Sequence, residues 1–130
     1  MMRITKKLQQ RLRNEESGFT LIELLIVLVI IGVLLAIAVP SYLGFKQRAE
    51  KRAAQSNVRA AIPAAEAYYS DQGNYTGMTL ANLKASYDAG LASLTVSASA
   101  NSYTLSNVQG TCTATFAGPG STNGISVVCT

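Results

Sequence analysis

The order of apolar and polar residues divides the chain into four segments. Residues 1–18 are polar and basic, residues 19–39 are almost purely apolar, residues 41–72 carry a periodic apolar pattern, and the chain beyond Thr95 is rich in Ser, Thr, Val and Gly. The apolar segment, FTLIELLIVLVIIGVLLAIAV, holds Glu23 as its only charge. As a helix it would span about 31 Å, the thickness of a bilayer's hydrocarbon core. A wholly buried globular helix is disfavoured, because so small a protein cannot cover it on every side.

The periodic segment predicts a second helical stretch that continues the first. Its apolar positions recur every three or four residues, as on one face of an amphipathic helix. They are Tyr42, Phe45, Ala49, Ala53, Val58, Ala61, Ile62, Ala65 and Tyr69. The aromatic members of this set, and Tyr68 beside them, are interpreted as packing residues. Pro40 is expected to bend the helix near Ala36, Pro63 to interrupt and kink it, and Gly73 to cap its end.

Four short strands are predicted in the C-terminal part. Runs rich in β-branched residues at 94–98, 103–108, 111–117 and 125–129 are separated by turn-forming residues. A short helix over Leu80–Tyr87, capped by Thr79, precedes them. So small a sheet needs the helix of residues 41–72 on one face. The predicted fold class is therefore α+β, with a long N-terminal helix, membrane-spanning and then amphipathic, packed against a small antiparallel β-sheet.

The composition excludes most enzymatic chemistry. The 130 residues include no His, no Trp and only two Cys. A His-based triad, a Cys/His zinc site and a haem-ligating His are thereby excluded. The seven acidic residues are scattered along the chain, which disfavours a carboxylate metal site. We therefore predict no enzyme activity, no catalytic residue, no metal and no cofactor.

The charge of the chain is concentrated at its N-terminus. Residues 1–18 contribute +3 of the formal net charge of +4. If this segment is removed, little net positive charge remains, so nucleic-acid binding is not predicted. The basic stretch Lys46–Arg59 is interpreted as a solvated helix face near a membrane rather than as a site for DNA or anionic lipid.

Cys112 and Cys129 are the only cysteines and fall in two predicted strands. We predict a disulfide closing a loop of 18 residues, worth about 3 kcal/mol by the loop-entropy estimate. Two unpaired buried thiols are the alternative. A disulfide would place the C-terminal region in an oxidising compartment and the leader in the cytoplasm. Charge counting cannot decide this orientation, because five basic residues flank the apolar segment on either side.

The motif at the start of the apolar segment is the most specific signal. A basic leader ends in Gly18, Phe19 opens the apolar run, and Glu23 follows four residues later. This motif, in GFTLIELLIVLVIIGVLLAIAVP, resembles the type IV pilin precursor family, including the pseudopilins of type II secretion and DNA-uptake systems. The resemblance covers roughly residues 3 to 75, and the C-terminal half matches in architecture only. An ordinary secretory signal peptide cut after Ala38 competes with it, but the length of the apolar run and Glu23 disfavour that interpretation.

The resemblance implies a division of the chain by processing and assembly. Residues 1–18 would be a cytoplasmic leader removed by a prepilin peptidase, residues 19–40 the transmembrane and filament-core helix, residues 41–73 its amphipathic half, and residues 74–130 a loop and C-terminal globular sheet region. The implied partners are further copies of the chain in a helical filament, the peptidase, the pilus assembly machinery and, before assembly, cytoplasmic-membrane lipid.

The resemblance also assigns roles to single residues. The peptidase would cut after Gly18 and methylate the new amine of Phe19, and Glu23 would guide assembly. Gly32 and Pro40 bracket a stretch that, in the resembling family, can lose helicity inside the filament.

Glu23 needs a partner on physical grounds alone. A carboxylate in an apolar helix costs about 2.5–3.5 kcal/mol on insertion scales, and no Lys or Arg lies within the segment. Cleavage after Gly18 would create a cation at Phe19. Pairing within one chain, between positions i and i+4, and pairing with a neighbour's amine to set the register both stay open.

Three functions follow, in this order. The first is a structural subunit of an extracellular type IV pilus, held before assembly in the cytoplasmic membrane with its C-terminal domain outside. The second is a pseudopilin of a type II secretion or DNA-uptake system. The third is a membrane-anchored binding domain that never polymerises, for which the precursor would stay intact and Glu23 would be dispensable.

Overall fold

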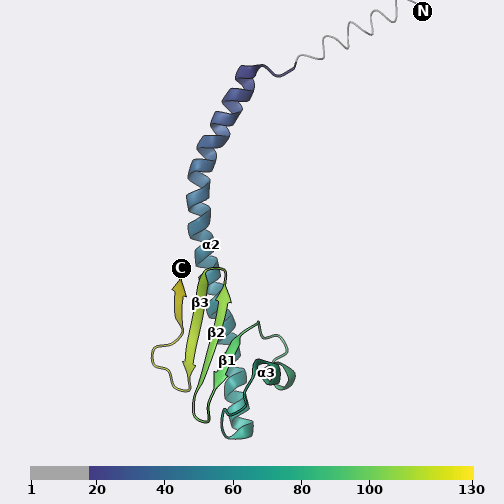
Figure 1. Ribbon diagram of the computed structural model, residues 1–130, viewed down its shortest axis with the longest axis vertical. Helices are drawn as coiled ribbons and strands as arrows, with labels where there is room; N and C mark the ends of the chain where they lie inside the picture. Colours follow the sequence, from purple (N-terminus) through teal and green to yellow (C-terminus); the bar gives the residue numbers. More distant parts are fainter. Residues whose placement is uncertain (1–17) are drawn as a thin grey trace, which may run out of the picture. The chain divides into compact units, whose positions relative to one another are not determined.

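A computed structural model describes residues 18–130 of the protein; the predicted leader, apart from Gly18, lies outside the described residues. The elements follow in the order α2 (Leu21–Gln72), α3 (Leu80–Ser86), β1 (Thr95–Ala98), β2 (Tyr103–Gln109), β3 (Cys112–Gly118) and β4 (Ser126–Cys129) (Figure 1). The chain divides into two compact units, of which the first ends at Ser41 and the second begins at Tyr42. The predicted α+β class is confirmed.

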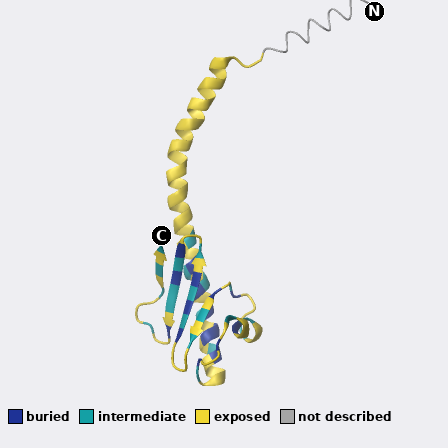
Figure 2. Ribbon diagram, viewed as in Figure 1, coloured by how far each residue is buried: buried dark blue, intermediate teal, exposed yellow. Residues whose placement is uncertain are grey.

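The described part of the first unit consists of residues 18–20, which are not helical, and the apolar beginning of α2. Every residue from Gly18 to Ser41 is exposed (Figure 2). Among the described residues, α2 is the one helix long and apolar enough to cross a membrane. The helix continues through Gly32 and Pro40 without a break. The bend expected near Ala36 stays a prediction.

The second unit is a four-stranded antiparallel sheet packed on the remainder of α2 (Figure 1). The strands follow one another in the order β1-β2-β3-β4, so each pairs with its neighbour in sequence. Each of the four strands begins and ends within one residue of its predicted bounds. Three alternate side chains of β2 point inward and are buried: Tyr103, Leu105 and Asn107.

The core forms where small helix residues meet large side chains from the rest of the unit. The buried face of α2 consists of Ala54, Val58, Ala61, Ala64, Ala65 and Tyr68. Alanines at four of these positions let the sheet approach the helix closely, and Tyr75, Leu83 and Leu105 fill the space between them. The predicted packing of the sheet against this part of the helix is therefore confirmed.

The predicted apolar stripe on α2 is wrong in its first half. Tyr42 and Phe45 are 64% and 68% exposed, so the prediction that they pack within this chain is wrong. Tyr69 is 42% exposed, but its ring centroid lies 4.7 Å from that of the buried Tyr75, so it does pack. Tyr68, beside Tyr69, is buried, so its interpretation as a packing residue is confirmed. The error at Tyr42 and Phe45 arises because helical periodicity identifies an apolar face but not the length over which the chain's own sheet covers it.

The prediction that Pro63 interrupts the helix is also wrong. The helix runs through this position to Gln72. Proline removes the N–H that would bond to the carbonyl of Arg59, and both residues are exposed, so water can satisfy that carbonyl.

Both predicted caps are confirmed. Gly73 follows α2 with φ of 74°, and its N–H donates to the carbonyl of Tyr69 at 2.8 Å. The hydroxyl of Thr79 accepts a hydrogen bond from the N–H of Asn82 at 3.2 Å, at the start of α3.

Candidate processing and assembly site

Gly18, Phe19 and Thr20 form a short non-helical segment immediately before α2. All three are exposed, and the Phe19 side chain is 83% exposed. Together with Glu23 they line a shallow hollow of about 270 Å³. The peptide bond between Gly18 and Phe19 therefore lies outside regular structure, where proteolytic cleavage is favoured.

Thr20 and Glu23 bond to each other across the first turn of α2. The Glu23 Oε2 accepts hydrogen bonds from the N–H of Thr20 at 2.7 Å and from its hydroxyl at 2.9 Å. In return, the N–H of Glu23 donates to the Thr20 hydroxyl at 3.3 Å. This reciprocal arrangement is a capping box, which satisfies backbone donors that the helix leaves free at its N-terminus.

The capping box gives Glu23 a partner that does not depend on cleavage. Among the described residues, its hydrogen bonds all involve Oε2, so Oε1 is available to a second donor. An amine created at Phe19, of the same chain or of a neighbour, is such a donor. Sequence reasoning missed this contact, although the Thr-x-x-Glu spacing at 20–23 was its signal.

Gly32 is not required by packing within the chain. A Cβ at this position would meet no atom within 4 Å. The small residue therefore leaves free surface on the apolar helix, which permits close approach by another helix. The flexibility assigned to Gly32 and Pro40 stays a prediction.

Cys112 and Cys129 form a disulfide between β3 and β4. The two residues are direct cross-strand partners, and their Cα atoms lie 4.0 Å apart. The bond fixes the short edge strand β4 to the sheet, and the Cys112 Sγ lies 3.7 Å from the carbonyl oxygen of Gln47 on α2. The predicted pairing is therefore present.

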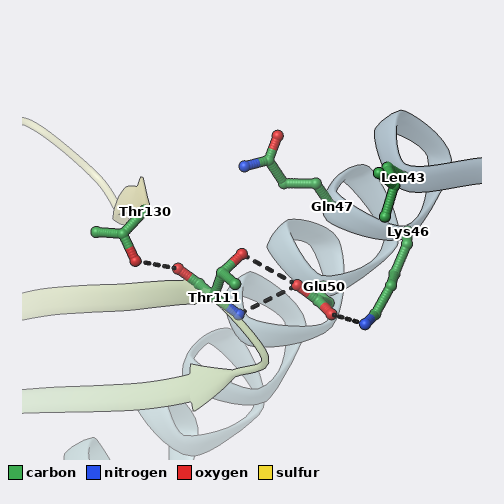
Figure 3. Close-up of a pocket in the computed structure, with 6 residues that line it drawn as sticks. All are labelled: Leu43, Lys46, Gln47, Glu50, Thr111 and Thr130. Atoms are coloured by element: carbon green, nitrogen blue, oxygen red, sulfur yellow. Dashed lines mark hydrogen bonds and ion pairs between the residues drawn. The ribbon is translucent and has the colours of Figure 1, made fainter. Parts of the chain in front are cut away.

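The tip of the β2–β3 hairpin is held by a carboxylate on α2 (Figure 3). The Glu50 Oε2 accepts hydrogen bonds from the N–H and the hydroxyl of Thr111, at 3.1 and 3.2 Å. The Lys46 ammonium lies 3.7 Å from the Glu50 Oε1. The Thr111 N–H, with smaller contributions from the Thr111 hydroxyl and Lys46, holds the pKa of the Glu50 carboxyl below its ordinary value.

Gly110 makes this contact possible. Its φ is 55°, whereas no described non-glycine residue has a positive φ, so the two-residue turn Gly110-Thr111 fits type II′. A Cβ at Gly110 would collide with the Glu50 carboxylate. Sequence reasoning identified the turn but not the residue it contacts, because Glu50 and Thr111 are separated by 61 positions.

Gly110→Ala is expected to destabilise the sheet unit more than Gly120→Ala does. Gly120 also has a positive φ, of 74°, but a Cβ there meets nothing within 4 Å. Both variants therefore incur backbone strain of about 1–2 kcal/mol, and only the first also displaces the Glu50 carboxylate from its hydrogen bonds to Thr111. Guanidinium unfolding followed by circular dichroism measures the difference.

A Glu50→Ala background provides the control for this comparison, because it removes the group that the new methyl would strike. There, the two glycine variants should lose similar stability. Equal losses in the wild-type background would contradict the proposed collision.

A second carboxylate, Glu66 on α2, bonds two buried tyrosines. Its Oε1 accepts from the Tyr103 hydroxyl at 2.7 Å, and its Oε2 accepts from the Tyr75 hydroxyl at 3.0 Å. The two rings lie with centroids 4.7 Å apart. Burial, followed by the hydrogen bond to Glu66, raises the pKa of Tyr75 to about 12 and also raises the pKa of Tyr103. These phenols remain neutral at physiological pH; Tyr103 attaches β2 to α2, and Tyr75 attaches the segment between α2 and α3 to the same carboxylate.

The fold and the N-terminal site define a class of protein: a helix long and apolar enough to cross a membrane, which begins just after an exposed Gly-Phe pair and continues into a unit with a small disulfide-bonded sheet. The model of the prokaryotic N-terminal methylation motif matches residues 13–39. The match includes Gly18, Phe19 and Glu23, the three residues on which the sequence resemblance rested.

Curated relatives extend this match beyond the motif. The chain is 39% identical over 95 residues to the type IV wide pilus major component PilA4 of Thermus thermophilus, covering 71% of this chain and 72% of the relative. It is 39% identical over 66 residues to the type IV major pilin protein PilA of Myxococcus xanthus, covering 51% of this chain and 30% of the relative. It is 40% identical over 65 residues to the type II secretion system core protein G of Escherichia coli, covering 50% and 45%.

The chain belongs to the type IV pilin and pseudopilin family. The Thermus alignment carries this assignment, because it covers more than two thirds of both chains. The chain spans less than half the length of the Myxococcus and Escherichia relatives, so the likeness to those two proteins is confined to part of each.

Proposed function

We propose that the chain is the structural subunit of an extracellular type IV pilus. It is made as a membrane precursor, cleaved after Gly18, methylated at Phe19 and polymerised through its N-terminal helix. One observation carries the proposal: an exposed non-helical Gly18–Phe19 bond precedes an entirely exposed apolar helix that has a carboxylate, Glu23, in its first turn.

The apolar helix requires a covering that the described chain does not supply. The large apolar side chains from Phe19 to Val39 are 47% exposed or more. Exposed apolar patches of this extent mark membrane or protein contacts. Lipid covers the helix in the precursor, and neighbouring copies cover it in the filament, so assembly transfers the helix from one apolar environment to another.

A pseudopilin role is the second candidate. The likeness to the secretion core protein G of Escherichia coli favours it, at an identity similar to that of the pilus relatives. The longer alignment with the Thermus wide pilus component favours the pilus. Electron microscopy of the cell surface separates the two, because only a pilus subunit is expected to form long surface filaments at ordinary expression.

Processing is the direct test of the proposal. The purified subunit should begin at Phe19 and carry one additional methyl group on its amine, as measured by intact mass and N-terminal peptide mass spectrometry. Gly18→Leu should leave uncleaved precursor in the membrane. A Cβ at Gly18 meets nothing within 4 Å, so this effect would arise in the peptidase and not in the fold of the chain.

Gly44→Leu is the matched control, because Gly44 is also exposed and a Cβ there also meets nothing within 4 Å. This variant should be processed normally. A mature N-terminus at Val39 would indicate an ordinary signal peptide, and an intact Met1 would indicate an anchored protein that is never processed. Either result would overturn the proposal.

A further inference from the structure

The strand-forming part of the chain contains no charged side chain. From Ala89 to Thr130, 42 residues include no Lys, Arg, Asp or Glu, whereas 14 are Ser or Thr. Surfaces of soluble domains ordinarily carry about 25–35% charged residues, which keeps molecules apart. All four strands lie in this stretch, so the face of the sheet turned away from α2 is entirely uncharged.

The strand register arranges this outer face in rows. Hydroxyls from all four strands form one row, in which neighbours are direct cross-strand partners: Thr95, Ser106, Thr115 and Ser126. A second row holds Val108, Thr113 and Val128, and each valine is 63% exposed. The face therefore presents a line of hydroxyls beside a pair of uncovered apolar side chains.

The charges of the second unit are placed elsewhere. Arg48, Lys51, Arg52 and Arg59 are exposed on α2, away from its sheet-covered face. Three of them, with Gln55, line a shallow hollow of about 310 Å³. Two copies that approach through this basic surface repel each other, whereas two that approach through their outer sheet faces do not.

We propose that the outer sheet face is the contact between filaments, each subunit packing this face against the same face of a subunit in an adjacent filament. The inference rests on the proposed pilus function. A hydroxyl both donates and accepts hydrogen bonds, so a row of hydroxyls is complementary to a copy of itself. No ion loses its hydration in such a contact, and the facing sheet covers the exposed side chains of Val108 and Val128.

The size of the face determines when the contact forms. Four short strands present roughly 400 Å² at strand spacings of about 4.8 Å. A stable protein–protein interface buries about 800 Å² per partner, so one pair of subunits associates weakly. A filament repeats the face along its length, and the repeated weak contacts act together. The expected state is side-by-side bundles of filaments.

Ser106→Lys tests the contact at the centre of the hydroxyl row. The variant should form filaments at wild-type abundance. Most of these filaments should stay in the supernatant of a low-speed spin and appear single by electron microscopy, because like charges now face each other across the contact. Ser86→Lys, at an exposed position of α3, introduces the same charge elsewhere and should bundle like wild type. Wild-type bundles should persist when salt rises from about 50 mM to about 500 mM, because no ion pair holds them.

Mixing two kinds of variant filament gives a more specific test of the contact. Ser106→Lys and Ser106→Glu filaments should each stay single, yet bundle when mixed, because opposite charges then meet across the contact. Single wild-type filaments, undiminished bundling of Ser106→Lys, or failure of Ser106→Lys to form filaments would overturn the inference. Absence of wild-type filaments would instead contradict the proposed function.

Discussion

Replacing Glu23 by alanine is expected to abolish filaments, or leave a small fraction of wild-type abundance, while membrane insertion, cleavage and methylation continue. The carboxylate costs about 2.5–3.5 kcal/mol in an apolar helix, so the variant inserts at least as readily as wild type. If Glu23 pairs with the amine of an adjacent subunit and so sets the register, the variant lacks the anion that this pairing requires. Filament yield after shearing, set against mature subunit in the membrane, measures the effect.

Two further variants separate the two roles that the Glu23 carboxylate can have. It accepts hydrogen bonds from Thr20 in the capping box, and it carries a negative charge. Glu23→Gln keeps an oxygen able to accept from the Thr20 N–H but carries no charge. Thr20→Val removes the hydroxyl that takes part in two of the three bonds and keeps the charge. If pairing between subunits sets the register, the Gln variant fails to assemble and the Val variant assembles. The reverse result would assign Glu23 to helix capping alone.

Expression of Glu23→Ala together with wild type tests the direction of the pairing. The mutant subunit retains its own amine, so it still satisfies a neighbour's Glu23 while offering no carboxylate. Sparse mutant subunits should therefore enter wild-type filaments better than a pure mutant population assembles. Pure Glu23→Ala filaments of wild-type abundance and length would contradict intersubunit pairing.

The local signals in the sequence determined most of the fold. The strands were predicted within one residue because runs of β-branched residues end at Gly, Ser and Asn. Thr79 and Gly73 cap helices through contacts within four residues, which spacing alone can reveal. The cysteine pair followed from elimination, since the chain has only two.

Contacts between distant parts of the chain were not predictable in the same way. The bonds from Thr111 to Glu50 and from Tyr103 to Glu66 span 61 and 37 positions, and they depend on which turn of α2 the sheet covers. The same dependence explains the errors at Tyr42 and Phe45. The capping box is different, because its residues lie three apart and the pattern was present in the sequence.

Glu66→Ala is expected to destabilise the sheet unit by about 2–4 kcal/mol, because it removes the acceptor of two tyrosine hydroxyls and leaving a buried polar group unpaired costs about 1–3 kcal/mol. Tyr75 and Tyr103 are only 1% and 2% exposed, so water reaches them poorly. The guanidinium midpoint of unfolding measures the loss.

Removing both hydroxyls provides the control for Glu66→Ala. In a Tyr75→Phe/Tyr103→Phe background, the same substitution should cost less than about 0.5 kcal/mol, because no donor is left unpaired. An undiminished cost there would contradict the bridging role of Glu66.

Alkaline pH should test the same cluster without altering the carboxylate. Burial first, and then Glu66, raises the pKa of Tyr75 to about 12 and raises that of Tyr103, so the folded state holds their protons more tightly than the unfolded chain. This contribution to stability is complete below the unfolded tyrosine pKa of about 10 and is lost as the pH rises toward the folded value. Unfolding midpoints of wild type should therefore fall between about pH 10 and pH 12.

The fall should be shallower in Glu66→Ala, which keeps the effect of burial, and shallowest in the double phenylalanine variant. A fall of equal steepness in all three would show that groups outside this cluster control alkaline stability.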